Sequence, residues 1–185
     1  MKKLLFAGAA AALVSTPAFA ADSTESFDVT ASVPESCLME DIDDIQLGEV
    51  DIVRSSGANA LLIESNSTQT GSPFYVSCNL ENQITITTQN GGLTNQTRSL
   101  DAEDDATFTD VIEYRIRLDN YFQGGGNASL FTVDGGAGYS TTSATRGAIH
   151  REVENRITIL RADNGDVRPL AGDYEDTVTV TVFSV

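Results

Sequence analysis

The sequence predicts an all-β sandwich, and two patterns support this prediction. Short runs rich in β-branched and aromatic residues alternate apolar with polar side chains, which is typical of half-buried strands. Clusters of Gly, Asn and Asp separate these runs, as expected for antiparallel strands joined by turns. No linker divides the chain and no repeat is evident, so one sandwich domain is expected.

Six of these runs follow one another between the middle of the chain and its end. The expected strands are residues 74–78, 83–89, 111–118, 129–133, 155–162 and 176–185. The acidic stretch 101–110 is expected to be a loop. Asn164 and Gly165 are expected to form a hairpin turn, a pattern that we favour over a metal-binding loop because the EF-hand spacing is absent.

The last predicted strand carries the most regular pattern in the chain. Val178, Val180 and Val182 occupy one face, which is expected to be core, and threonines occupy the other. No predicted strand follows it, so its far edge is expected to be open. An open edge of this kind is a template for pairing with another chain.

The front of the sequence is expected to be a secretory signal peptide over residues 1–20. Lys2 and Lys3 precede an apolar run, which ends at the small-residue site Ala18-Phe19-Ala20. The run is shorter than the about 20 apolar residues that span a bilayer, so no membrane insertion of the mature chain is expected. The chain is therefore expected to be exported across a bacterial-type inner membrane.

A further strand pattern follows the signal peptide directly. Phe27, Val29, Ala31 and Val33 point to one side and polar residues to the other, and Pro34 ends the pattern. Chain ends are usually frayed unless something binds them. This pattern therefore raises the question of what the segment pairs with.

The charge of the mature chain excludes several classes of partner. Removing Lys2 and Lys3 leaves nine arginines and no lysine against 27 acidic residues. Nucleic acid is not an expected partner, because phosphate binding needs a basic face, and anionic membrane is disfavoured for the same reason. The acidity is interpreted as an aid to solubility outside the cell.

The two cysteines and the single histidine bear on chemistry. Cys37 and Cys78 are expected to form a structural disulfide in an oxidising compartment. His150 is the only histidine and has no local catalytic signature, so it is interpreted as a surface or loop residue. No catalytic site, metal site or cofactor is predicted, and the chain is not expected to be an enzyme.

Several motifs together resemble the spore coat protein U-type domain, as found in major pilins of the archaic chaperone–usher pathway. The resemblance covers most of the mature chain, and its most specific part is LAGDYEDTVTVTV at residues 170–182. Leu47 stands where the family commonly has Phe, and the chain ends in FSV where the family commonly has a terminal aromatic residue. The other matching motifs are Cys37, IQLGEV at 45–50, FYVSC at 74–78, the turn Asn90-Gly91-Gly92, Arg98-Ser99-Leu100 and IEYRIRLD at 112–119.

The resemblance implies an incomplete immunoglobulin-like sandwich over residues 34–185 that lacks its final strand. Residues 21–33 would be an N-terminal donor-strand extension, with Phe27, Val29, Ala31 and Val33 inserted into a neighbouring subunit. The implied acceptor groove lies between the last strand and the first, near residues 38–50. Its predicted residues are Leu47, Val178, Val180 and Val182.

The implied partners are other copies of the chain in a head-to-tail filament, with a periplasmic chaperone and an outer-membrane usher acting during assembly. The implied location is the cell surface, reached through the periplasm, with a role in adhesion or biofilm formation. The alternative that the residues leave open is a self-complete secreted β-sandwich that binds glycan or calcium. The acidic surface favours this alternative, whereas the absence of Trp, a common sugar-binding platform, disfavours it.

Overall fold

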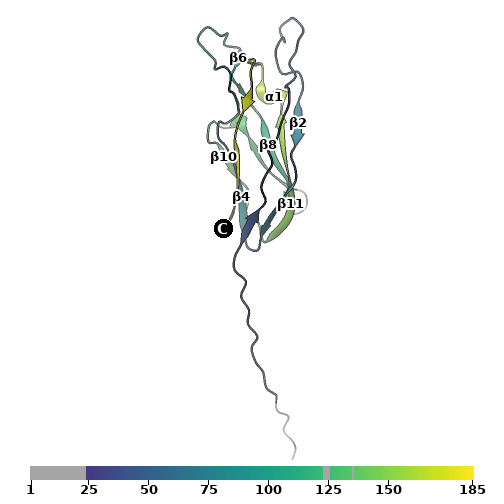
Figure 1. The fold of residues 1–185 in the computed structure, drawn as a ribbon, viewed down its shortest axis with the longest axis vertical. Helices are drawn as coiled ribbons and strands as arrows, with labels where there is room; N and C mark the ends of the chain where they lie inside the picture. The colour runs from purple at the N-terminus through teal and green to yellow at the C-terminus, as the bar shows by residue number, and fades with distance from the viewer. Residues whose placement is uncertain (1–23, 123–125, 135) are drawn as a thin grey trace, which may run out of the picture. The chain divides into compact units, whose positions relative to one another are not determined.

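A computed structural model describes residues 24–122, 126–134 and 136–185. The predicted signal peptide lies outside these residues. The chain divides into two units, Met1–Val33 and Pro34–Val185. In the first unit, residues 24–33 form no strand and all are exposed. The second unit holds every strand and helix that the structure describes (Figure 1).

The larger sheet of the second unit has the strand order β1-β3-β11-β8-β9, and β2 also pairs with β11. All of its pairs are antiparallel. The strands are β1 (Cys37–Met39), β2 (Ser67–Thr70), β3 (Phe74–Cys78), β8 (Arg115–Phe122), β9 (Gly126–Phe131) and β11 (Ile149–Ile159).

The facing layer is the sheet β10-β4-β14, extended by short strands from the connecting loops. Figure 1 shows β4 and β10 on one side of the domain, with β2 and β11 on the other. The strands of this layer are β4 (Asn82–Thr88), β10 (Ser140–Thr142) and β14 (Val178–Ser184). The short elements are β5 (Leu93–Asn95), β6 (Phe108–Thr109), β7 (Val111–Ile112), η1 (Thr132–Asp134), α1 (Arg161–Asn164), β12 (Arg168–Pro169) and β13 (Tyr174–Glu175).

The core lies between the two layers and follows from the alternation of the strands. In β4, every second residue is buried, beginning with Asn82 and continuing through Ile84 and Ile86. Tyr114 and Tyr121 are among the largest fully buried side chains. The inward faces thus form one apolar interior, as in an immunoglobulin-like β-sandwich, and the predicted fold class is confirmed.

Several local predictions were wrong for identifiable reasons. The predicted strand 111–118 is interrupted at residues 113–114, where Asn164 binds the backbone of Glu113 through hydrogen bonds of 2.8 and 3.0 Å. The same amide donates to the carbonyl of Leu160, so residues 161–164 form the short helix α1 instead of a hairpin turn. The next strand, β12, then pairs parallel with β6, so the sandwich is not purely antiparallel.

The first strand of the domain is much shorter than expected. Only β1 pairs with a neighbour, and residues 40–50 form no strand. The segment 26–33, whose alternation is typical of a strand, is also unpaired. Both segments carry apolar residues, alternating in 26–33 and at positions 42, 45, 47 and 50 in the other, but neither pairs with a described strand.

Candidate functional site

The candidate site is a groove of about 1310 Å³ along the second unit. Its floor consists of apolar side chains from β7, β8 and β11 and of Tyr114, which lies between β7 and β8. These side chains belong to the main hydrophobic core. The floor residues are Ile112, Tyr114, Ile116, Leu118 and Ile157.

One rim of the groove is β14, an edge strand of its sheet. The backbone carbonyl of Thr177 accepts a hydrogen bond from Gln89, and the backbone N–H of Val185 donates one to Glu81. The backbone N–H and C=O groups of the odd-numbered residues of β14 therefore point toward β4. In an antiparallel ladder, alternate residues direct both backbone groups to the same neighbour. Val178, Val180 and Val182 therefore direct their N–H and C=O groups toward the open side, where no described strand pairs with them.

The other rim is the segment 41–50, which follows β1. Ile42, Ile45, Leu47 and Val50 are half-buried against the core. No backbone group of residues 41–50 makes a hydrogen bond to the described part of the chain. Unpaired backbone groups that are removed from water cost free energy. The backbone groups of this rim must therefore bind either water or an added strand.

Asp176 fixes the start of the β14 rim. Its carboxylate accepts hydrogen bonds from the backbone N–H groups of Asn90 and Thr177 and from the Tyr114 hydroxyl, which lies 2.8 Å away. Tyr114 is buried in the floor. Burial raises the pKa of the Tyr114 hydroxyl, and the hydrogen bond to Asp176 raises this pKa further. The phenol therefore stays protonated and joins the floor to the rim.

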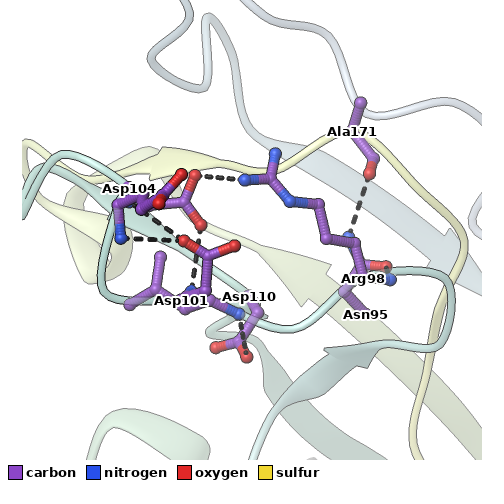
Figure 2. Close-up of polar contacts among 8 residues, drawn as sticks. Asn95, Arg98, Asp101, Asp104, Asp110 and Ala171 are labelled. Carbon is purple, nitrogen blue, oxygen red and sulfur yellow. Dashed lines mark hydrogen bonds and ion pairs between the residues drawn. The ribbon is translucent and has the colours of Figure 1, made fainter.

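A second hydrogen-bonded unit fixes the turn that precedes β14. The Asn95 amide donates to the carbonyl of Ala171 at 3.2 Å (Figure 2). Its oxygen accepts from the N–H groups of Thr97 and Arg98. Gly172 has φ +152°, and a Cβ there would lie 2.4 Å from the Asn95 carboxamide oxygen. Only glycine fits this position, which explains the glycine in the LAGDY motif.

The acidic loop beside this turn uses its carboxylates internally. Figure 2 shows Asp104 paired with Arg98, and Asp101 accepting from the backbone of the same loop. Asp110 accepts from the N–H of Leu100 at 3.0 Å. Hydrogen bonds from the Thr107 backbone and hydroxyl lower the pKa of Asp105. These bonds shape the loop at one end of the groove.

The acidic side chains and His150 are the other candidates for chemistry among the described residues. Among them, no group of three or more His, Cys, Asp or Glu side chains is placed to hold a metal ion. His150 lies in β11, where its ring stacks on Tyr75 and its Nδ1 contacts the Ser77 hydroxyl at 2.8 Å. Among the same residues, no helix is long and apolar enough to cross a membrane.

The structure places the predicted site residues as follows. Cys37 and Cys78 form the predicted disulfide, at paired positions of β1 and β3. Leu47, Val178 and Val180 line the groove, whereas Val182 packs on the core without lining it. Phe27, Val29, Ala31 and Val33 are exposed in the first unit.

Sequence reasoning did not assign the floor residues to a groove, and it missed two polar residues of the site, Asp176 and Asn155. Asp176 was included only in a strand, although its place before the Thr-Val run is the signal that a carboxylate begins β14. Asn155 lines the groove between buried aliphatic positions of β11. Its polarity within an otherwise apolar inward row is the signal that could have identified it.

Comparison with known families identifies the domain. The family model of the Spore Coat Protein U domain matches residues 23–181. No curated protein matches the chain. The Spore Coat Protein U domain is associated with pilus and fimbrial subunits of chaperone–usher systems, which are structural, surface-exported proteins. Because the match covers most of the chain, this protein belongs to the Spore Coat Protein U domain family.

Proposed function

We propose that the chain is the structural subunit of a chaperone–usher pilus, in which the N-terminal segment of one copy fills the groove of the next. The observation that carries this proposal is the groove itself. It has an apolar floor and lies between two stretches of backbone that lack a partner among the described residues. An inserted strand satisfies both conditions at once, because its backbone pairs with the rims and its alternate side chains cover the floor.

The N-terminal segment has the properties that such a groove needs. Phe27, Val29 and Val33 are 86%, 85% and 81% exposed, so the segment displays an apolar row in water. Residues 27–33 are seven residues long, the same length as β14. Burial of this row would contribute about 25 cal/mol for each Å² of apolar surface removed from water.

The start of the domain is anchored where this segment ends. The Asn79 side chain donates to the carbonyl of Pro34 at 2.7 Å and accepts from the N–H of Ser36 at 2.8 Å. The disulfide at Cys37 follows directly. The segment therefore leaves the domain from a fixed point, which suits it to transmit load from one subunit to the next.

Such a contact joins two different surfaces and does not close on itself. Repeated, it builds a head-to-tail filament. Before assembly, the empty groove would need a temporary strand, which we assign to a periplasmic chaperone, and the exchange would occur at an outer-membrane usher. The filament would then serve attachment or biofilm formation at the cell surface, and the chain would have no catalytic role.

Deletion of residues 21–33 tests the proposal. The expected product is exported and retains the disulfide but forms no polymer, because no strand remains to enter the neighbouring groove. Polymer content is measured by electron microscopy and by size-exclusion chromatography of surface extracts. The matched control is Thr30→Asp, which adds charge to the opposite face of the same segment and should retain polymer. Normal polymer after the deletion would overturn the proposal.

A further inference from the structure

The floor of the groove contains one polar side chain in an aliphatic row. Along β11, Val153, Ile157 and Ile159 are buried on the inward face, and Asn155 lies in the same row with only 5% of its surface exposed. Asn155 also lines the groove. An amide at this position faces any strand that enters.

The amide of Asn155 is left without a partner where other buried asparagines are satisfied. Its Oδ1 is buried and accepts no hydrogen bond from the described residues. By contrast, Asn82 accepts from the Tyr121 hydroxyl at 2.7 Å and donates to two carbonyls. Asn95 and Asn164 likewise bind backbone groups with both amide atoms. Buried amides without a partner are rare in folded proteins, so this one calls for a specific explanation.

The surrounding backbone holds the amide at the floor. The N–H of Gly71 donates to the Asn155 carbonyl at 2.9 Å. A Cβ on residue 71 would lie 2.4 Å from Oδ1, so the absence of a side chain at Gly71 makes the space that the amide occupies. Asn155 is thus a packed and positioned group.

We propose that Asn155 is a register-determining residue of the groove, and that the N-terminal segment of a second copy places Ala31 over it. This inference rests on the proposed function. A Val or Phe over the amide would fill the space beside it and leave its buried Oδ1 without a partner, which is costly. Ala31 is the only small side chain in the apolar row, and it leaves room for a bridging water that satisfies the amide.

The first test compares substitutions at two positions of the segment in the full-length chain. The rate at which assembled polymer dissociates in guanidinium is measured. Serine in place of alanine at position 31 should leave this rate unchanged or lower it, because a hydroxyl can bind the amide. At position 29, the rate for Val29→Ser should exceed that for Val29→Ala about fivefold, because the hydroxyl there meets an apolar floor. Equal effects of serine on the dissociation rate at the two positions would show that Ala31 does not lie over Asn155.

The second test couples the two sides of the contact. Ala31→Val should raise the dissociation rate about tenfold in the chain that carries Asn155, since it removes the room for a water and leaves the amide without a partner. In an Asn155→Leu chain the same change should alter the rate less than twofold, because the amide is gone. Equal effects of Ala31→Val in both chains would overturn the inference.

The two proposals fail in distinguishable ways. If the 21–33 deletion still forms polymer, the proposed function fails. If the deletion forms none but positions 31 and 155 act independently, the filament contact stands and only the role of Asn155 fails. Should the Asn155→Leu chain fail to be exported, the serine comparison decides the register alone.

Discussion

The two sides of the domain differ in how completely their backbone is paired. In the larger sheet, β11 is paired on both sides, with β3 and β2 on one side and β8 on the other. Across the groove, β14 is paired on one side only, and residues 41–50 make no backbone hydrogen bond to the described residues. β11 thus lies inside a sheet with partners on both sides, whereas the groove has the side chains of a core without a strand between its rims.

The difference shows that apolar patterning and backbone pairing are separate requirements. Ile45 and Leu47 pack against the core and Val178 and Val180 face it, so the sequence provides both rims with apolar residues. The ladder between the rims is nevertheless absent. Edges of this kind invite strand addition, and natural proteins usually protect them. Here the exposure is consistent with an edge that serves assembly.

The disulfide joins β1 to β3 in the larger sheet, and its removal should have the largest effect on folding. Replacing Cys37 and Cys78 by Ser together should lower the free energy of unfolding by about 3–4 kcal/mol, because the link closes a loop of 41 residues. Guanidinium denaturation of the secreted protein, followed by circular dichroism, measures the change. An unchanged midpoint would mean that β1 is held by pairing with β3 alone.

The Tyr114–Asp176 hydrogen bond joins the two sides, so its loss should have an intermediate effect. Tyr114→Phe should lower the free energy of unfolding by about 1.5 kcal/mol, which is the low end of the usual range for a hydrogen bond to a charged group. Because Asp176 fixes the β14 rim, polymer yield should fall as well. Tyr75→Phe is the control, since the Tyr75 hydroxyl makes only an exposed contact of 3.3 Å. Equal losses of unfolding free energy in the two variants would show that the Tyr114–Asp176 hydrogen bond stabilises the domain no more than an exposed contact does.

Substitution of Glu113 should have the smallest effect on stability, and this effect should depend on pH. Burial, the largest cause, raises the pKa of the Glu113 carboxyl, and the nearby Asp163 raises it further. The folded state therefore binds this proton more tightly than the unfolded chain, and stability rises as the pH falls through the raised pKa.

Glu113→Gln should consequently raise the melting temperature by about 1–2 °C at pH 7. The gain should vanish as the pH falls below the ordinary value of 4.5, where the parent carboxyl is protonated in both states. Thermal melting at both pH values measures this, with Glu103→Gln in the exposed loop as the control. A gain that persists at low pH would assign the effect to packing rather than to charge.

The sequence was sufficient for the fold class, the disulfide and the regular strands. β3 has the predicted bounds and β4 and β14 lie close to theirs, because alternation over five to seven residues is a strong local signal. The register between strands and the order of the sheets depend on contacts far apart in the chain, which alternation does not encode.

The missed elements depend on side chain to backbone hydrogen bonds. The α1 turn forms because Asn164 binds Glu113, 51 positions away, and no local pattern indicates this. The first half of β11 was missed because polar residues such as Arg151 and Glu152 conceal its alternation. Asn155 was missed because a polar residue within a strand predicts only that the strand is less apolar.

The central claim is that one copy supplies the strand and another supplies the groove, and mixing two defective subunits tests it most directly. The first subunit carries Phe27→Asp and Val29→Asp, which spoil its N-terminal segment by placing charges in an apolar groove. The second carries Val180→Asp, which spoils its groove. Each subunit is expressed alone, and then both are expressed together.

We expect no assembly from either subunit alone and a one-to-one dimer from the mixture. The dimer cannot grow, because its free segment and its free groove are both defective. Mass measurement by light scattering distinguishes the products. Monomers alone in the mixture, or filaments as long as those of the parent chain, would contradict the insertion of one copy's segment into the groove of another.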